Sequence, residues 1–496
     1  MLEELNENFG SELYDRDSRS MTNICRIIFD YQNPISINSL MEKTKLTRQT
    51  IYKYIHEINQ IYRNIGHANE IISNVNGQYY FKGNSFDYAE LFLRIISNTV
   101  LTKLAIALIN NPSVDFKEFC FENFISQSTV RRLITNINNR INTFNLAITI
   151  KNNSISVVGS ENKIRYVFAS YFWRTFRGLY WPFTAVDKDN IINLIDTLGK
   201  KLHFTIKSGQ KIELAYIFAV NICRAKNNHS IGHITPFDSF LVTKLFSQLA
   251  DNFEQVSKEF FAIAEIDIRF IFLWLSTLPQ FYSITDTKTL FLQTLKDKKI
   301  RNESTKFIEI ITKADPESLK LIPTQYNQLL LDLICGRLSV ELFGNLPFTV
   351  SDLNLNKYTN ILAPSYIKRI SMIILKTHPS IKTSDIKALA IRYGWALALF
   401  MPIHKFERTI NIYLDTDILI DLESQMKNQL RNILCNFFNI EIETDINRLN
   451  QADLILTTSL LTDYLPLSTP KIQIHPQLSS KELNVIIKFC EDLIKV

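Results

Sequence analysis

The fold is decided by residues 36–66, which read SINSLMEKTKLTRQTIYKYIHEINQIYRNIG. Ser36 and Thr47 are both placed to cap a helix N-terminus, where a hydroxyl accepts a bond from a free backbone N–H. After the second cap, apolar residues recur at spacings of four, three and four, which is helical periodicity. They are Ile51, Ile55, Ile58 and Tyr62. A short helix, a tight turn and a longer capped helix make a helix-turn-helix pattern.

A β-hairpin is expected directly after this pattern. Residues 71–75 and 78–82 are β-prone and flank Asn76-Gly77, the pair preferred in a type I′ turn. A further helix is expected in front of the pattern, over residues 18–31. A hairpin that follows the second helix at once is the wing of a winged helix-turn-helix.

The same pattern returns 79 residues later, where residues 113–144 read SVDFKEFCFENFISQSTVRRLITNINNRINTF. Equivalent positions keep their chemistry, as in the pairs Thr47 and Ser126, Ile51 and Val130, Ile55 and Ile134, and Ile58 and Ile137. Leading helices are expected over residues 87–110, and a second hairpin over residues 147–150 and 154–158. Two matches in one register predict a tandem pair of winged units. The alternative is two ordinary helical hairpins in a core.

Basic charge gathers on these units, although the net charge of the whole chain is only +6. Residues 123–160 hold four basic and no acidic side chains, and residues 41–63 hold five basic and two acidic ones. Such local clusters favour polyanion binding, because neutralising phosphates supplies much of the affinity for DNA. The residues expected to point outward and contact phosphates and base edges are Arg131, Arg132, Gln127, Ser128, Thr129 and Asn136 in the second unit and Arg48, Gln49, Tyr52 and Lys53 in the first. Solvated helix surface is the alternative interpretation of each.

Composition limits the fold class. With 496 residues, 46% hydrophobic and 21% charged, the chain is long enough for about three to five domains, and disorder is excluded as its main state. Only 12 residues are Gly and 14 are Pro, against a usual Gly share of about 7%. Because dinucleotide-binding folds need glycines to bring backbone N–H groups against phosphate, we expect a mainly helical protein instead.

Targeting and catalytic signals are absent from the sequence. No stretch reaches 18 consecutive apolar residues, and the acidic N-terminus lacks the apolar run of a secretion signal. The six cysteines stand far apart with no CxxC pair, which is typical of buried thiols in a reducing cytosol. Serine-hydrolase, zinc-protease and phosphate-loop motifs are missing. We therefore expect a cytoplasmic protein with no enzyme activity, cofactor, metal or membrane contact.

The middle of the chain, residues 160–400, shows helical periodicity, with a predicted boundary between two bundles at the charged residues 297–302. Candidate helices cover residues 187–202, 213–225, 237–250, 261–278, 287–297, 304–314, 325–340, 363–376 and 383–400. His229 and His233 have the spacing of two metal ligands on one helix face, but Gly232 and Pro236 favour a loop. His203 and His378 stand alone.

From residue 409 the pattern becomes α/β. Strands are expected over residues 409–414, 440–443, 454–457 and 472–474, and helices over residues 418–437 and 481–494. This order predicts a small sheet flanked by helices. Five apolar residues lie in what we expect to be a loop: Leu460, Leu461, Tyr464, Leu465 and Leu467. They form a candidate contact surface, with packing onto their own domain as the alternative.

In this order the segments resemble the Mga/AtxA-type regulators, virulence transcription factors of low-GC Gram-positive bacteria that contain phosphotransferase-system regulation domains (PRDs). The resemblance covers essentially the whole length and rests on three parts. The first is the pair of winged units. The second is GSENKIR at residues 159–165, which is similar to the G-x-E-x-x-x-R entry to the regulatory region of related antiterminators and activators. The third is DLILTTS at residues 453–459, which looks like the EIIB domain of the phosphotransferase system.

The resemblance implies a mainly α, multidomain architecture. Its parts are winged helix-turn-helix units at residues 10–84 and 85–160, PRD-like helical bundles at residues 161–297 and 298–404, and an EIIB-like α/β domain at residues 405–496. It implies that the N-terminal units bind double-stranded promoter DNA and that the C-terminal domain forms a homodimer or higher oligomer. It also makes the general phosphotransferase proteins candidate partners, with His203, His229, His233 and His378 as candidates for regulatory phosphorylation.

The sequence departs from the EIIB pattern at the loop after the first strand. EIIB domains carry a phosphoacceptor Cys there, whereas this chain has Asp415-Thr416-Asp417. Carboxylates repel a dianionic phosphate, so we expect a non-catalytic module used for contact. Two other functions remain as alternatives. An RNA-binding antiterminator with PRDs would have a small β-rich domain in place of the winged units, and a phosphotransferase component finds support only in the C-terminal fold.

Overall fold

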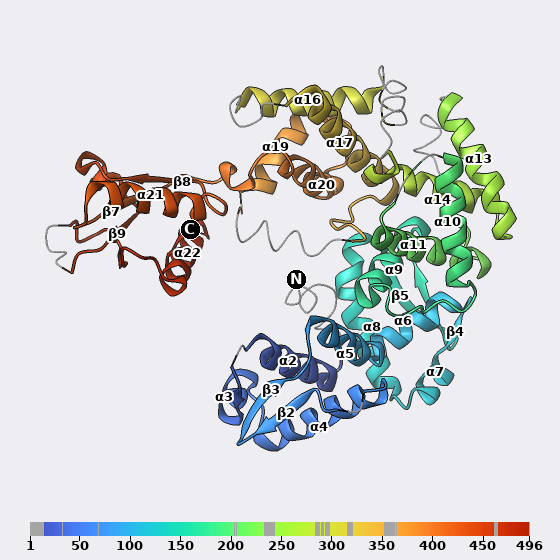
Figure 1. Cartoon of the computed structure of the whole chain (residues 1–496). Helices are drawn as coiled ribbons and strands as arrows, with labels where there is room; N and C mark the ends of the chain where they lie inside the picture. The colour runs from blue at the N-terminus through green and yellow to red at the C-terminus, as the bar shows by residue number, and fades with distance from the viewer. Residues whose placement is uncertain are drawn as a thin grey trace. The chain divides into compact units, whose positions relative to one another are not determined.

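A computed structural model describes residues 14–31, 33–67, 69–202, 204, 206–232, 244–282, 288, 292, 298–314, 321–351, 363, 365–460 and 465–495. The chain divides into two compact units (Figure 1). The first holds Met1–Thr294 and Glu341–Leu353, and the second holds Leu295–Val340 and Asn354–Val496. The expected fold class is confirmed, because the chain is mainly helical, with helix-turn-helix elements near its N-terminus and a parallel sheet near its C-terminus. The finer subdivision into five domains stays a prediction.

The first winged unit is built as the pattern predicts. Its elements are α2 (Arg16–Asp30), β1 (Ile35–Ser36), α3 (Ile37–Thr44), α4 (Arg48–Asn64), β2 (Ile72–Val75) and β3 (Gln78–Phe81). Ser36 caps α3 and Thr47 caps α4, each through its hydroxyl. Asn76 and Gly77 both have positive φ, as a type I′ turn requires. The antiparallel sheet has the order β1-β3-β2.

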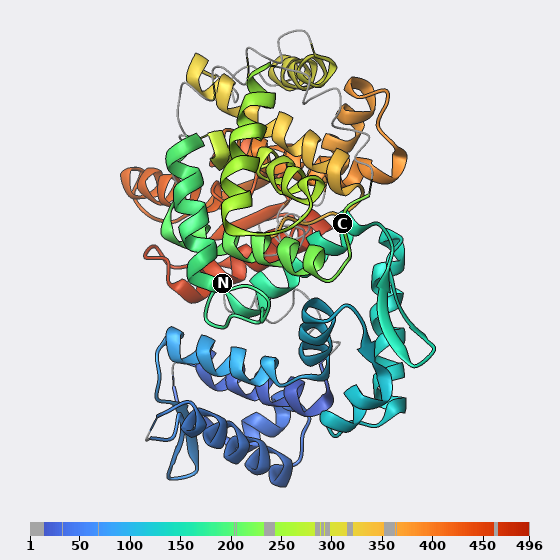
Figure 2. The ribbon, with the colours of Figure 1, turned by 90° about the vertical axis from the view of Figure 1, so that its right-hand side faces the viewer.

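The second winged unit repeats this plan in the same compact unit, and Figure 2 shows its hairpin in teal. Its elements are α5 (Ser85–Ser97), α6 (Val100–Asn110), β4 (Val114–Asp115), α7 (Phe116–Glu122), α8 (Gln127–Ile141), η2 (Asn142–Phe144), β5 (Ala147–Lys151) and β6 (Ser154–Val158). Ser126 caps α8 as Thr47 caps α4. The sheet order β4-β6-β5 matches that of the first unit. The tandem repeat is therefore present in the fold as well as in the sequence.

A pair of asparagines, which the sequence analysis did not single out, ties each long helix to its wing. Asn59 of α4 accepts from the Ile72 N–H and donates to the Ile72 carbonyl, both at 2.9 Å. Asn138 of α8 makes the same two bonds to Ile148, at 2.7 and 2.9 Å. Asn59 and Asn138 are themselves 79 positions apart. Each asparagine amide thus pairs with both the N–H and the carbonyl of one residue near the start of a wing strand, so that neither backbone group is left without a hydrogen bond.

In the first compact unit, the two winged units are followed by a helical bundle. It contains α9 (Glu161–Phe176), α10 (Lys188–Leu202), α11 (Ser208–Lys226), α13 (Lys244–Phe260), α14 (Glu265–Ser276) and η4 (Pro279–Tyr282). Three predicted boundaries were wrong. The helix expected from residue 213 already begins at Ser208. The helix expected to end at residue 250 continues to Phe260, because Phe253 and Val256 extend its buried face. The helix expected from residue 261 starts only at Glu265, after an extended Ala264. The helix predicted over residues 287–297 lies largely outside the described residues.

The second compact unit begins with another group of helices. Its elements are α16 (Lys299–Ala314), α17 (Pro323–Phe343), α19 (Tyr366–Thr377), η5 (Thr383–Asp385), α20 (Ile386–Ala398) and η6 (Ile403–Phe406). The last residues of α17, from Glu341 to Phe343, belong to the first compact unit. The segment of residues 341–353 was expected in the second helical bundle, but it belongs to the first compact unit. There the Phe348 carbonyl accepts from the Tyr166 hydroxyl of α9 at 2.9 Å.

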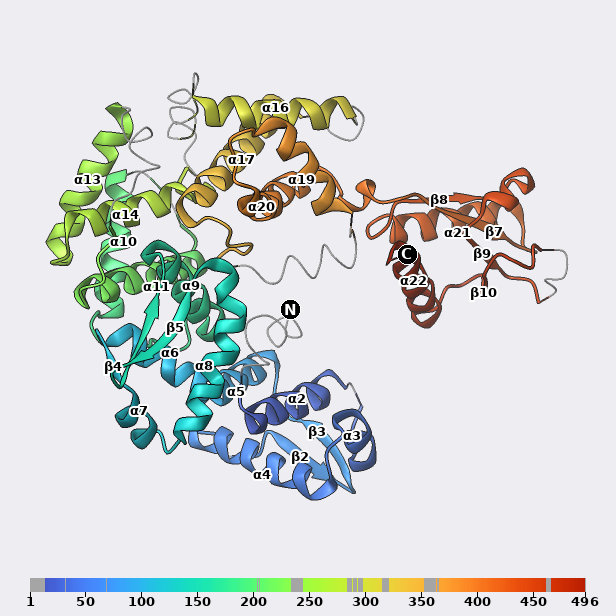
Figure 3. The same ribbon diagram turned by 180° about the vertical axis from the view of Figure 1, so that it is seen from behind.

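The C-terminal domain is the small α/β fold that the sequence predicts (Figure 3). It contains β7 (Ile410–Asp415), α21 (Ile420–Leu434), β8 (Ile440–Glu443), η7 (Ile446–Gln451), β9 (Leu454–Thr457), β10 (Lys471–Gln473) and α22 (Ser480–Lys495). The sheet has the order β10-β9-β7-β8, and all neighbouring strands are parallel. Helix α21 is shorter than the predicted range of residues 418–437, and it buries Met426, Leu430 and Leu434.

Two further sequence expectations concern the whole chain. In the described part, no single helix is long and apolar enough to cross a membrane, and α5 with α6 reaches that hydropathy only across a 73° bend. Five of the six cysteines are buried free thiols, as expected. Cys435 is exposed, because the α21 helix ends there.

Candidate nucleic-acid interface

The second recognition helix, α8, presents a polar and basic outer face. Val130, Leu133, Ile134 and Ile137 are buried and hold the helix against its own unit. Gln127, Ser128, Arg132 and Asn136 are exposed, as the sequence predicts. Thr129 differs, since it is half-buried and its hydroxyl is 2.8 Å from that of the cap residue Ser126. It therefore contributes to the cap more than to the outer face.

Arg131 is exposed but does not project freely into solvent. Its guanidinium lies 4.6 Å from the centre of the Phe116 ring, at the start of α7. Both arginines are exposed, as the sequence predicts, and Arg131 in addition contacts an aromatic ring. A cation–π contact of this kind orients the guanidinium before any ligand arrives. It leaves the planar group's N–H donors available for a phosphate.

The first recognition helix, α4, carries its basic groups differently. Arg48, Gln49, Tyr52 and Lys53 are all exposed. Arg48 donates to the side-chain oxygen of Asn38 at 3.1 Å. The Lys53 ammonium lies 3.6 Å from Glu57 and 4.0 Å from Asp17. Because two carboxylates flank one ammonium, the outer face of α4 has less positive charge to offer a phosphate than that of α8.

In the second winged unit, the end of α7 and the turn after it expose two aromatic side chains that the sequence did not indicate. Phe121 and Phe124 are 82% and 96% exposed, immediately before the cap of α8. Phe124 has a φ of 55°, and Lys45 holds the same left-handed turn position in the first unit with a φ of 57°. Phe121 lies on α7, and Phe124 lies in the turn that follows. The exposure of Phe124 follows from the turn geometry, which no periodicity reveals.

The GSENKIR stretch enters the helical bundle through a buried ionic network. Arg165 is fully buried and donates to Asp267 at 2.5 Å and to Glu161 at 3.1 Å. Arg224 donates to both oxygens of Glu161, at 2.6 and 2.8 Å. Buried charges require such pairing. The network joins α9, α11 and α14, so the Glu and Arg of the motif hold the bundle together.

Gly159, the first residue of that motif, is required by the backbone. Its φ is 140°, and a Cβ there would lie 2.5 Å from the Leu146 side chain and 2.7 Å from the Asn145 carbonyl oxygen. Any other residue would clash at this point. Gly159 thus packs closely against the backbone just before β5, at the point where the chain passes from wing strand β6 to α9. The second winged unit and the bundle are thereby joined at a short, tightly packed corner.

The candidate phosphorylation sites differ in accessibility. His203 and His233 lie outside the described residues. His229 is half-buried, its ring Nε2 is 3.3 Å from the Pro112 carbonyl oxygen, and partial burial beside Arg224 lowers its pKa. His378 is buried, with Nδ1 2.7 Å from the Thr377 hydroxyl and Nε2 2.9 Å from the Tyr393 hydroxyl. Burial lowers the pKa of His378 to about 4. A phosphoryl group could reach His378 only after one of these bonds breaks.

The carboxylates at the end of β7 and in the loop after it are hydrogen-bonded to threonines at the end of β9. Thr457 donates to Asp415 at 2.7 Å, and Thr458 donates to Asp417 at 2.6 Å. The Asp417 N–H points to the Thr458 hydroxyl at 3.1 Å. In the described residues, no group of three or more His, Cys, Asp and Glu side chains is arranged to hold a metal ion. The loop offers carboxylates where phosphotransfer requires a nucleophilic thiolate and free N–H donors.

Comparisons with known proteins identify both N-terminal units. Residues 21–80 match a helix-turn-helix domain family, and residues 84–172 match the Mga helix-turn-helix domain. These ranges contain α4 with its wing and α8 with its wing. The resemblance to Mga/AtxA-type regulators is confirmed on this part of the chain.

Three curated relatives are named as regulators. A protein of Streptococcus pneumoniae serotype 4 named as a trans-acting regulator is 22% identical over 253 residues, covering 50% of this chain and 49% of its own. The anthrax toxin expression trans-acting positive regulator of Bacillus anthracis is 28% identical over 88 residues, 18% of each chain. The capsule synthesis positive regulator AcpA of Bacillus anthracis is 24% identical over 132 residues, 26% of this chain and 27% of its own. The matches thus span about half the length of these relatives or less.

Proposed function

We propose that this protein is a DNA-binding transcription regulator of the Mga/AtxA type, acting in the cytoplasm on promoter DNA. One observation carries the proposal: two winged helix-turn-helix units in the same register, the second with an exposed basic face on α8 and no acidic residue between positions 123 and 160. A recognition helix enters the major groove with its N-terminal residues against base edges, while the wing follows the backbone. The relatives named as regulators support the same function.

Binding of full-length protein to duplex DNA at two salt concentrations tests this proposal. We expect a dissociation constant that rises steeply with salt, because basic side chains displace counterions from phosphates. A random duplex and a candidate promoter fragment distinguish general from sequence-selective binding. Single-stranded RNA of equal length is the control for an antiterminator. Tighter binding to RNA than to either duplex would contradict the proposal.

Self-association through the C-terminal domain is the second part of the proposal. Leu460, after β9, and Leu467, before β10, are 85% and 95% exposed, and Leu419 and Ile420 at the start of α21 are also exposed. Exposed apolar side chains of this kind are candidates for a contact surface. The expected patch needs one correction: Leu465 is buried against Tyr413 and Ile455. Leu461 and Tyr464 lie outside the described residues.

Light scattering on a set of variants tests the contact surface. Deletion of residues 405–496 should convert a dimer to a monomer and weaken DNA binding, because two linked copies on one duplex bind more tightly than one. Leu460→Asp with Leu467→Asp should have the same effect without removing the domain. Val485→Asp, at an exposed position on α22, is the matched control. A deletion variant that stays dimeric at micromolar concentration would place the interface elsewhere.

Tuning of activity by phosphorylation is the third part, and it concerns the histidines. A phosphoryl group would add roughly −1.5 to −2 charges, by analogy with other phosphorylated side chains. Incubation with the general phosphotransferase proteins and phosphoenolpyruvate, followed by mapping of acid-labile phosphate, tests it. Of the two described candidates, we expect label on His229 and not on His378, whose two ring nitrogens are both hydrogen-bonded. If no histidine is labelled, the proposal that phosphorylation of the helical bundles tunes activity is wrong.

A further inference from the structure

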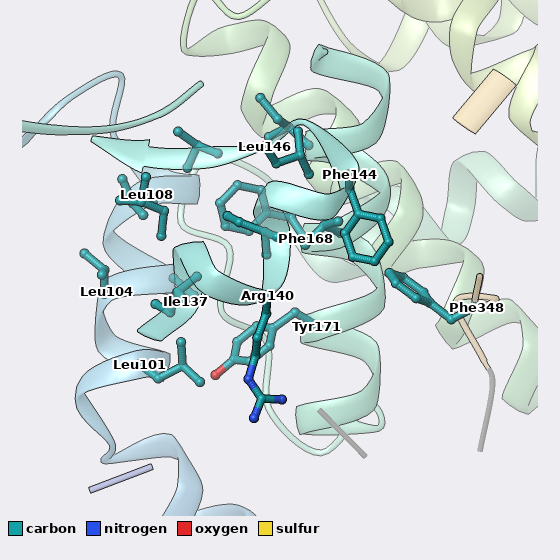
Figure 4. A pocket seen from close by; sticks show the side chains of 16 residues that line it. Leu101, Leu104, Leu108, Ile137, Arg140, Phe144, Leu146, Phe168, Tyr171 and Phe348 are labelled. Atoms are coloured by element: carbon teal, nitrogen blue, oxygen red, sulfur yellow. The ribbon is translucent and has the colours of Figure 1, made fainter. Parts of the chain in front are cut away.

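The second winged unit and helix α9 enclose an apolar cavity of about 320 Å³. Figure 4 shows its lining, to which α6 contributes Leu104, α8 contributes Ile137, and α9 contributes Phe168. These three side chains are all buried. The cavity lies wholly within the first compact unit. Engineered apolar cavities of about half this volume already bind benzene, and 320 Å³ falls at the lower end of ligand pockets.

The cavity has one cationic end. Arg140, on the last turn of α8, is the charged residue among those that line it. In Figure 4 its side chain extends past the apolar lining toward Tyr171, and its guanidinium lies at the edge of the lined space. The Tyr171 hydroxyl, which also lines the cavity, is 2.7 Å from the Thr102 hydroxyl. An apolar interior with a guanidinium at its edge matches a ligand that has an aliphatic tail and a carboxylate head.

We propose that this cavity binds a medium-chain fatty acid, with the tail among the apolar side chains and the carboxylate at Arg140, and that its occupation alters DNA binding by the second winged unit. Unfilled, the lining forgoes dispersion contacts that a tail would supply. Each buried methylene should strengthen binding about fourfold, from ~0.8 kcal/mol per CH₂. The binding claim stands on the cavity alone, and the coupling claim rests on the proposed function.

Helix α8 provides the physical link between the two sites. Arg132, on its outer face, and Ile137, in the cavity wall, are five residues apart, which is about 7.5 Å along a helix. A ligand that packs against Ile137 and pairs with Arg140 therefore acts on the same rigid element that carries the proposed DNA contacts. Gly159, between wing strand β6 and α9, packs closely against Leu146, which also lines the cavity, so a change at the cavity would reach the wing as well. Linkage then requires DNA and ligand to alter each other's affinity by the same factor.

Isothermal titration of the full-length protein with decanoate, below its micelle concentration, tests the site. We expect saturable binding, weakening about fourfold per methylene removed as the chain shortens to octanoate. Decanol, which lacks the charge, should bind about tenfold more weakly than decanoate. Arg140→Gln should remove that tenfold advantage and leave decanol binding unchanged. Arg132→Gln, on the outer face of the same helix, is the matched control and should bind decanoate like the wild type.

Filling the cavity gives an independent test. Ala105→Phe places a ring in the space from α6 and should abolish saturable decanoate binding, with the thermal unfolding temperature confirming that the variant is folded. If Ala105→Phe fails to fold, Val167→Phe, which fills the space from α9, serves the same purpose. Absence of saturable binding to the wild type, or undiminished binding to a folded filled variant, would overturn the site. Equal affinities for decanoate and decanol would overturn the role of Arg140.

The coupling is measured by DNA affinity with and without saturating decanoate. We expect a change of threefold or more in the wild type and none in the filled variant. Saturable decanoate binding with unchanged DNA affinity would overturn the coupling and leave the site standing. A protein that binds decanoate but no duplex at all would overturn the proposed regulator function and, with it, the coupling.

Discussion

The two winged units share a scaffold but differ in the charge that they offer. Caps, turn positions and the asparagine that ties helix to wing all recur at an offset of 79 residues. On α4, however, Lys53 is flanked by two carboxylates and Arg48 is bonded to Asn38. On α8, Arg131 is oriented by Phe116 and Arg132 is exposed. The scaffold is thus the same in both winged units, while the outer face of the recognition helix differs.

This difference teaches that a repeated fold does not imply a repeated function. Scaffold positions are constrained by backbone groups that must be satisfied wherever the fold occurs. Outer positions are constrained only by what they touch. We therefore expect the second unit to supply most of the affinity for DNA and the first to supply orientation, and three predictions test that division.

The largest expected effect is on DNA affinity. Arg131→Ala combined with Arg132→Ala should abolish specific binding, a loss of about 100-fold or more, since each phosphate or base contact contributes about 1–3 kcal/mol. Thermal stability should fall only slightly, through the lost contact of Arg131 with Phe116. Arg48→Ala with Lys53→Ala should have a much smaller effect. Fluorescence anisotropy with a target promoter measures both, and equal losses in the two double variants would break the comparison.

The next effect is on stability, where both winged units should be destabilised and the first somewhat more than the second. Asn59→Ala removes two hydrogen bonds to Ile72 and leaves buried backbone groups without partners, at a cost of about 2–3 kcal/mol. Asn138→Ala removes the same bonds from Ile148 at a half-buried site, so we expect about 1–2 kcal/mol. Denaturant unfolding monitored by circular dichroism measures both. A negligible cost for Asn59→Ala would show that the shared bridge does not stabilise the scaffold.

The smallest effect on DNA affinity should come from removing the two carboxylates that flank the Lys53 ammonium in the first winged unit. Asp17→Asn with Glu57→Gln removes both carboxylates beside Lys53. DNA affinity at low salt should rise about two- to fivefold, and the salt dependence should steepen by about one counterion. Adding Lys53→Gln should reverse the gain. If the gain survives that third change, Lys53 is not the group released.

Burial explains which candidate residues the sequence could identify. The outward positions of α8 could be predicted because helical periodicity separates the face of Val130 and Ile134 from the face of Arg132. Leu465 could not, because a loop has no period that tells a buried leucine from the exposed Leu467. His378 could not either, since its partners Thr377 and Tyr393 are brought to it by the packing of α19 on α20.

The sequence by itself determined the repeat, the caps, the wings and the α/β change near residue 409, because these depend on contacts between residues close in the chain. Local hydrogen bonds and hydrophobic period are written in consecutive residues. Only the tertiary structure decided the Arg165–Asp267 pair, the return of residues 341–353 to the first unit and the cavity behind α8. Each of these joins segments far apart in the chain, and their meeting depends on the packing of whole elements, which no local pattern encodes.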